Sequence, residues 1–333
     1  MAALWRQAVH WFAPVWNPMA CLPYDDWHDT YEAGYPTHAK DLLNRLTIIQ
    51  KKALRLGLQG DQRTPLKGHG LDFADLREYF PGDDIRKIDW NVYARTRQPH
   101  IKEYLEEKQL TSFLVVDLSP SMFLGHRRTK AQLAVDLAGL LGLMLEAANH
   151  KIGLAVLYGE TLRHVQPRQG RLHLQALLQQ LLSAYGEASG NRVCQPEGWL
   201  SAQLARIRGM LSRHATVFFL SDFLDAGTDW EGQLGAMSHQ CELTSVMIQD
   251  PCDVTLPPPA MGLMLLGDPE GAGRVMLDAT DALNRRILER QLGSHRLAVE
   301  GVLRSMGPVL FAGTDEEPVA MLVRLLTKRS GGA

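Results

Sequence analysis

The amino-acid sequence predicts an α/β fold with a mostly parallel, doubly wound sheet. From residue 113 onward, short apolar segments alternate with longer segments of helical periodicity, as strands joined by helical crossovers do. Two of the short segments, Phe113–Val116 and Thr216–Leu220, are apolar throughout, which is typical of strands covered by helices on both faces. They run into Asp117 and Asp222, so polar groups follow the carboxyl ends of two buried strands. Ligands bind at this edge of open parallel sheets.

The composition is that of an ordinary globular protein. Its 333 residues have room for one large domain and a smaller one, and 45% are apolar and 22% charged. The net charge of −2 gives no global electrostatic footprint for nucleic acid. Four scattered cysteines without a Cys-x-x-Cys pair fit a reducing compartment. Because no segment is apolar over a membrane-spanning length, we expect a cytoplasmic protein without a transmembrane helix.

The chain divides into three predicted parts. Residues 1–38 are an aromatic-rich extension that holds four of the seven tryptophans. We expect it to pack on its own domain, to dock a partner, or to contact a membrane surface peripherally. Residues 39–112 begin with an amphipathic helix over Lys40–Leu58 and continue with a charged segment. Residues 113–333 form the α/β domain.

The charged segment, residues 72–108, carries both signs of charge in similar amounts, which argues against a site for a polyanion. Pro81-Gly82 has the composition of a type II turn, since proline fixes the first central angle and glycine accepts the positive one. His100–Tyr104 is expected to be an edge strand leading towards the strand at 113. Charges placed among aromatic side chains indicate an arginine–carboxylate network, a recognition surface, or both.

Hydrophobic periodicity places the remaining elements of the α/β domain. Predicted helices are Thr129–Asn149, Leu172–Ala184, Glu197–Leu211, Trp230–His239, Asp281–Met306 and Val319–Leu326. Further predicted strands are Ile152–Tyr158, Leu162–Val165, Leu243–Gln249 and Val309–Ala312, with a hairpin insertion over Met264–Leu277.

The segment Asp117-x-Ser119-x-Ser121 follows the first buried strand directly. Residues two apart in an extended chain point the same way, so three side-chain oxygens can face one side. Hard divalent cations such as Mg²⁺ prefer such oxygen ligands. The alternative is a polar loop in which Asp117 and Ser119 cap the following turn. If the strands that precede Asp117 and Asp222 are neighbours, the two carboxylates converge and favour a cation site.

These residues resemble a known family. Asp117-x-Ser119-x-Ser121 with the later Asp222 is similar to the metal-ion-dependent adhesion site of von Willebrand factor A domains. The charged segment is similar to the signature of domain-of-unknown-function family 58, the von Willebrand A-like proteins associated with MoxR-type AAA+ ATPases, and the resemblance runs from about Gly70 to Leu326. The signature positions, which serve partner binding or structure, are Arg77, Tyr79, Pro81, Gly82, Asp83, Asp84, Arg86, Asp89, Trp90, Arg95 and Lys102.

The resemblance implies a von Willebrand factor A-like (Rossmann-type) sheet and a binding role rather than catalysis. Ser119 and Ser121 would ligate Mg²⁺ directly, with Asp117 and Asp222 in support, and a partner's carboxylate would complete the coordination. The implied partners are a MoxR-type ATPase and a client protein that the pair assembles or matures. One feature departs from the family pattern. The segment 186–197, which corresponds to a loop with a ligating threonine, offers Ser189 and Asn191 but no threonine.

A catalytic alternative is a metal-dependent phosphate-ester hydrolase with Asp117 as the nucleophile, because a strand ending in aspartate superficially resembles haloacid-dehalogenase phosphatases. Those enzymes have a general-acid aspartate two residues later, where this chain has Ser119. The sequence also lacks a phosphate-binding Gly-x-x-x-x-Gly-Lys loop, a Gly-x-Ser-x-Gly elbow and a His-Glu-x-x-His helix. We therefore predict a protein that is not an enzyme.

Overall fold

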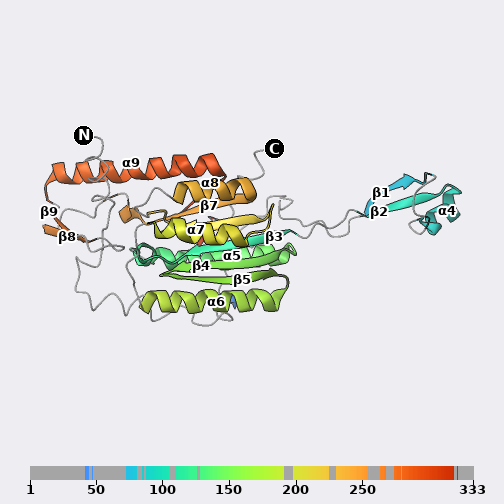
Figure 1. Ribbon diagram of the computed structural model, residues 1–333, viewed down its shortest axis with the longest axis horizontal. Helices are drawn as coiled ribbons and strands as arrows, with labels where there is room; N and C mark the ends of the chain where they lie inside the picture. The colour runs from blue at the N-terminus through green and yellow to red at the C-terminus, as the bar shows by residue number, and fades with distance from the viewer. Residues whose placement is uncertain are drawn as a thin grey trace.

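A computed structural model describes residues 42–44, 47, 73–80, 85, 88–104, 110–125, 128–190, 198–224, 230–253, 255, 263–267, 274–278, 280–318 and 321. Its centre is a six-stranded sheet in the order β10-β7-β6-β3-β4-β5 (Figure 1). The strands are β3 (Thr111–Asp117), β4 (Lys151–Tyr158), β5 (Thr161–Arg168), β6 (Thr216–Ser221), β7 (Glu242–Gln249) and β10 (Val309–Gly313). All neighbours run parallel except β4 and β5. The predicted mostly parallel α/β sheet is confirmed.

Helices cover both faces of this sheet (Figure 1). They are α5 (Lys130–Ala147), α6 (Arg171–Gly190), α7 (Trp199–Met210), α8 (Trp230–Gln240) and α9 (Ala282–Met306). Alternate residues of β3 enter two separate cores, because successive side chains of a strand point to opposite faces. Leu114 and Val116 pack with α5 and α6. Phe113 and Val115 pack with α7 and α8.

The central strand β3 lies between β4 and β6, with Val116 level with Leu220 of β6. The next residues along, Asp117 and Ser221, therefore leave the sheet side by side at its carboxyl edge. The expectation that the strands before Asp117 and Asp222 are neighbours is confirmed.

The charged segment folds into a separate small unit, which lies apart from the six-stranded sheet in Figure 1. Strand β1 (Phe73–Glu78) pairs antiparallel with β2 (His100–Tyr104), and α4 (Trp90–Thr96) lies between them in sequence. The prediction of a strand at His100–Tyr104 is confirmed, but it pairs with β1 in a two-stranded sheet. Strand β1 and α4 were not predicted, because the dense charges hide their periodicity.

The remaining elements follow the prediction with small shifts. Helix α6 continues through Gly190, beyond the predicted end at Ala184. Strands β8 (Leu263–Gly267) and β9 (Arg274–Asp278) form the predicted hairpin. Of the terminal helices predicted at 40–58 and 319–326, residues 42–44, 47 and 321 are described, and they are helical. The turn predicted at Pro81-Gly82 lies outside the described residues. In the part of the chain described here, no helix is both long and apolar enough to cross a membrane.

Candidate functional site

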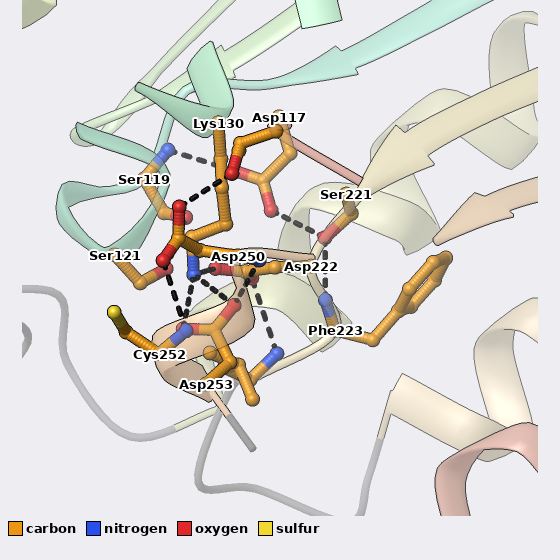
Figure 2. Close-up of polar contacts among 12 residues, drawn as sticks. Asp117, Ser119, Ser121, Lys130, Ser221, Asp222, Phe223, Asp250, Cys252 and Asp253 are labelled. Carbon is orange, nitrogen blue, oxygen red and sulfur yellow. Dashed lines mark hydrogen bonds and ion pairs between the residues drawn. The ribbon is translucent and has the colours of Figure 1, made fainter. Parts of the chain in front are cut away.

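The carboxyl end of β3 holds Asp117 in a fixed, buried position (Figure 2). Its Oδ1 accepts a hydrogen bond from the backbone N–H of Ser119 at 2.8 Å. Its Oδ2 accepts a second one from the hydroxyl of Ser221 at 2.7 Å, which joins the ends of β3 and β6. Both carboxylate oxygens are thus oriented by neighbours, so Asp117 has a single, well-defined placement.

Ser119 and Ser121 lie together beside Asp117. The chain turns into the short 3-10 helix η3 (Pro120–Phe123) directly after Ser119, with proline in the first turn, where no N–H is needed. This turn brings the Oγ atoms of Ser119 and Ser121 to 3.1 Å, and both residues are buried. The predicted grouping of the three Asp-x-Ser-x-Ser side chains is therefore present.

Asp222 follows β6 in a tight turn. Its Oδ1 accepts a hydrogen bond from the N–H of Leu224 at 3.2 Å, and the N–H of Phe223 donates to Ser221 Oγ at 3.0 Å. Phe223 adopts the left-handed conformation with φ of 56°, which is strained for a residue with a Cβ. Its buried ring, 5.7 Å from that of Trp230, holds the turn in this conformation.

A lysine missing from the sequence prediction lies inside the site. Lys130, the first residue of α5, is completely buried. Its Nζ is 2.8 Å from Asp222 Oδ2 and 3.3 and 3.2 Å from Oδ1 and Oδ2 of Asp253. Its position offered a signal, because a cation in the first turn of a helix opposes the helix dipole and so needs nearby carboxylates.

Two further acidic residues that the sequence analysis missed close the site at β7. Asp250 follows β7 directly, and its Oδ1 accepts from Cys252 N at 3.0 Å while its Oδ2 accepts from the Thr314 hydroxyl. Asp253 Oδ2 accepts from Asp250 N at 2.8 Å. Asp250 is a third aspartate at the carboxyl end of a buried strand, and this spacing was the signal that could have found it.

The electrostatics of the site show partly uncompensated negative charge. Burial, and then the nearby Asp222, raise the pKa of Asp117 to about 7, against the hydrogen bonds that lower it. Burial alone would lower the pKa of Lys130, but Asp222 and Asp253 outweigh burial and raise it. Burial also raises the pKa of Asp253, against the effect of Lys130. A further cation at this edge would therefore be stabilised.

A pocket adjoins the site between β7 and α9. Asp222 and Asp253 line one side of it, and His295 and Arg296 of α9 line the other. The buried atoms Asp222 Oδ2, His295 Nε2 and Arg296 Nε accept or donate no hydrogen bond of regular geometry within the described part of the chain. Asp222 Oδ2 forms a 2.8 Å ion pair with Lys130 Nζ.

The side chains at the β3–β6 edge fit a hard divalent cation. Among the described residues, no three His, Cys, Asp or Glu side chains are grouped so as to hold a metal ion by themselves. A site here must therefore include the hydroxyls of Ser119 and Ser121, which lie 3.1 Å apart beside Asp117. Carboxylate and hydroxyl oxygens are ligands suited to Mg²⁺. Asp222 directly follows Ser221, whose hydroxyl donates to Asp117 Oδ2, so its side chain belongs to the same edge (Figure 2).

The other predicted site residues lie elsewhere. Ser189 is part of α6 rather than of a loop, and Asn191 lies outside the described residues. Asp89 caps α4 by accepting from the N–H groups of Asn91 and Val92 at 2.9 and 3.3 Å.

Most of the signature positions lie in or near the small β1–β2–α4 unit. Tyr79 donates its backbone N–H to Pro99 O at 2.9 Å, and Trp90 and Arg95 are exposed on α4. Arg77 and Lys102 belong to β1 and β2, where their side chains are not described. Outside the described residues lie Pro81, Gly82, Asp83, Asp84 and Arg86.

Comparison with known proteins shows related chains in mycobacteria. Uncharacterized proteins of Mycobacterium bovis and Mycobacterium tuberculosis are 30% identical over 293 residues, which is 87% of this chain and 90% of each relative.

Two solved structures show a weaker likeness. The pilus adhesin SpaC of Lactobacillus rhamnosus GG, in its open conformation, gives a TM-score of 0.35 at 11% identity over 68% of this chain and 30% of that chain. A mutant of the PilB minor pilin from Streptococcus sanguinis gives 0.31 at 8% identity, over 70% and 65% of the two chains. Likeness at this level says nothing about the function of this chain.

The sequence also matches a family over residues 75–298, a span that begins within β1 and includes α4, β2, Asp117 and Asp222. The match and the mycobacterial relatives agree with the signature recognised in the charged segment. The chain therefore belongs to the family described as Protein of unknown function DUF58.

Proposed function

We propose that this protein is a non-catalytic interaction module in which Asp117, Ser119, Ser121 and Asp222 hold Mg²⁺, as in the metal-ion-dependent adhesion site of von Willebrand factor A domains. The six-stranded sheet and its helices are, in this proposal, a von Willebrand factor A-like domain. When bound, the ion supplies a positive centre to which a carboxylate of a partner protein attaches. The protein's own residues orient the ligands and exclude bulk water.

The observation that carries the proposal is the gathering of oxygen-bearing side chains at the carboxyl edge of β3 and β6 (Figure 2). Buried carboxylates are costly unless they are paired or bind a cation. The pKa of Asp117, raised to about 7 by burial and by Asp222, reflects this cost. A cation that keeps Asp117 ionised would offset it.

The partner that we propose is a MoxR-type AAA+ ATPase, which acts with this protein in the cytoplasm on the assembly or maturation of client proteins. The family resemblance of the charged segment is the main support. The exposed aromatic side chains of that segment add to it, because Phe80 and Trp90 are 62% and 61% exposed. Large aromatic side chains are common anchors of protein interfaces. The β1–β2–α4 unit is thus our candidate contact with the ATPase.

The alternative of a phosphate-ester hydrolase with Asp117 as nucleophile has less support. Both oxygens of Asp117 accept hydrogen bonds, from Ser119 N and from the Ser221 hydroxyl, and the residue is buried. A nucleophilic carboxylate must be open to substrate, and Asp117 is only 3% exposed. We therefore favour the binding role.

Capture of the ATPase on immobilised full-length protein tests the proposed function. We expect retention in Mg²⁺, and loss of retention in a chelator or in the Ser119→Ala/Ser121→Ala variant. Ser294→Ala/Ser305→Ala is the matched control, because both hydroxyls lie exposed on α9 and donate to carbonyls of their own helix. Retention that is indifferent to both Mg²⁺ and the Ser119 and Ser121 hydroxyls would reject the proposal. Hydrolysis of a phosphate ester, lost on Asp117→Asn, would support the alternative.

A further inference from the structure

Lys130 is a buried cation within the candidate cation site. Its side chain is completely buried at the start of α5, directly after the helix cap Thr129. A buried ammonium is stable only if carboxylates or other acceptors compensate for its lost hydration. The two carboxylates that do so come from different strands, Asp222 after β6 and Asp253 after β7.

The Lys130 ammonium bridges two carboxylates. Both oxygens of Asp253 accept hydrogen bonds from Nζ, at 3.3 and 3.2 Å. Asp222 Oδ2 is closer, at 2.8 Å. The ammonium can therefore lose its contact with Asp222 and still keep both hydrogen bonds to Asp253.

The Lys130 ammonium meets Asp222 at Oδ2, while Oδ1 accepts a hydrogen bond from the N–H of Leu224 at 3.2 Å. A metal ion bound to Oδ2 would therefore lie within a few ångströms of the ammonium. A second positive charge beside Lys130 would be repelled, since unit charges 4 Å apart interact by about 4 kcal/mol near a protein surface. The ammonium and a divalent ion thus exclude each other from the same carboxylate oxygen.

We propose that Lys130 competes with the divalent cation for Asp222, and that Asp253 holds the ammonium when the cation is bound. This inference rests on the proposed function and deepens it, because it makes Lys130 and Asp253 regulators of cation affinity without ligating the ion. Before the cation binds, Lys130 balances the charge of Asp222 and keeps the site assembled. When the cation binds, the ammonium is held by Asp253 at the end of β7.

The competition links the cation to two more strand ends. Asp253 Oδ2 also accepts from Asp250 N, and Asp250 accepts from Thr314 after β10. A change in the hydrogen bonds between Lys130 and Asp253 would therefore also affect the hydrogen bonds of Asp250 and Thr314, at the ends of β7 and β10. The pocket lined by Asp222, Asp253 and His295 opens at the same place.

A double-mutant cycle tests the competition, with Mg²⁺ alone titrated calorimetrically into the full-length chain. Asp253→Asn leaves the ammonium with Asp222 as its one charged partner among the described residues, so we expect Mg²⁺ affinity to fall about tenfold. Lys130→Met removes the competitor, so affinity should rise, and the effect of Asp253→Asn should vanish in the Lys130→Met background. The Mg²⁺-induced rise in Tm should follow the same order.

Several results would overturn the inference. Competition is rejected if Asp253→Asn leaves Mg²⁺ affinity unchanged, or if it lowers this affinity equally in the wild-type and Lys130→Met backgrounds. It is also rejected if Lys130→Met binds Mg²⁺ more weakly than the wild type does. If Lys130→Met does not fold, Asp278→Asn replaces it as the comparison. The Asp278 carboxylate is exposed and accepts from Thr280, so a loss confined to Asp253→Asn supports competition and equal losses reject it.

The same titrations separate this inference from the proposed function. Suppose that the wild type binds Mg²⁺, that Ser119→Ala/Ser121→Ala does not, and that Asp253→Asn has no effect. This result supports the cation site and rejects the role of Lys130. Binding by Lys130→Met but not by the wild type supports competition and rejects a Mg²⁺-loaded wild-type protein. Absence of binding in every folded variant rejects both.

Discussion

The hydroxyl of Ser221 donates a 2.7 Å hydrogen bond to Asp117 Oδ2, so a buried side-chain contact joins the ends of the two central strands. The same hydroxyl accepts from the N–H of Phe223. It therefore connects the carboxylate at the end of β3 with the strained turn that carries Asp222. Both halves of the candidate cation site depend on this one side chain.

Removal of the Ser221 hydroxyl should destabilise the fold. Ser221→Ala leaves Asp117 Oδ2 and the Phe223 N–H without their shared partner, and we expect a loss of about 1–3 kcal/mol in the free energy of unfolding. Urea denaturation measures it. Ser294→Ala on the exposed face of α9 is the control and should change stability by less than about 0.5 kcal/mol. Equal stability of Ser221→Ala and wild type would contradict the role given to this hydroxyl.

The stability of the cation-free protein should fall as the pH rises. Burial and Asp222 raise the pKa of Asp117 from 3.8 to about 7, so between these values the folded state holds a proton that the unfolded state has lost. Folding is then linked to proton uptake by Asp117. By neutral pH its ionisation should lower the free energy of unfolding by about 4 kcal/mol, at about 1.4 kcal/mol per pKa unit.

Urea unfolding in a chelator at about pH 5 and about pH 8 checks this slope. Asp117→Asn should flatten it, although Asp253, whose pKa burial also raises, contributes in the same direction. Saturating Mg²⁺ should also flatten the slope by favouring the ionised carboxylate. Burial lowers the pKa of His150 and His295, which adds a slope of opposite sign to wild type and variant alike. Equal slopes for wild type and Asp117→Asn in chelator would therefore contradict this prediction.

Loss of the Lys130 charge should be costly without Mg²⁺. Lys130→Met leaves Asp222 without its ion-pair partner and removes both hydrogen bonds from Nζ to Asp253, and breaking such a buried pair typically costs about 3–5 kcal/mol. Chemical denaturation in chelator measures this loss. Lys151→Met, at the partly exposed start of β4, is the matched control and should cost under about 1 kcal/mol. Similar losses for the two variants would show that Lys130 is not a structural counter-ion.

Trp90 should matter for binding rather than for stability. Its side chain is 61% exposed, and its ring approaches that of Tyr93 edge-on, with the centroids 6.0 Å apart. Trp90→Ala should lower the free energy of unfolding by less than about 1 kcal/mol. It should weaken the complex with the ATPase by about 2 kcal/mol if Trp90 anchors the interface.

Surface plasmon resonance on the full-length chain measures this affinity. Leu172→Ala is the control, since Leu172 is 82% exposed on α6, away from the charged segment. An affinity that Trp90→Ala leaves unchanged would place the contact elsewhere.

Some parts of this architecture follow from local patterns in the sequence. Strands β3 and β6 are runs of apolar residues that end in polar ones, and parallel strands place such ends at one edge. The pairing of Asp117 with the β6 end could therefore be predicted once the strands were neighbours. The grouping of Ser119 and Ser121 was predicted as well, but the 3-10 turn η3 brings the two hydroxyls together rather than an extended chain.

Other parts depend on contacts between distant residues. Hydrophobic patterning assigns lysines to the surface, and Lys130 is buried because Asp222 and Asp253, about a hundred positions away, compensate its charge. The bond from Thr314 to Asp250 joins residues 64 positions apart. In the segment of β1 and α4, charged residues are so frequent that no regular spacing of apolar residues is visible. Some of these residues have local roles, as Asp89 does when it caps α4. These features need the fold before they can be recognised.

Calorimetric titration of Mg²⁺ into the full-length protein tests the central claim most directly, with Ser119→Ala/Ser121→Ala as the comparison. The account predicts saturable binding by the wild type at neutral pH and its loss when both hydroxyls are removed, with the fold intact by circular dichroism. Binding that is equally strong in the double variant, or absent from the wild type, would contradict a cation site at the carboxyl ends of β3 and β6.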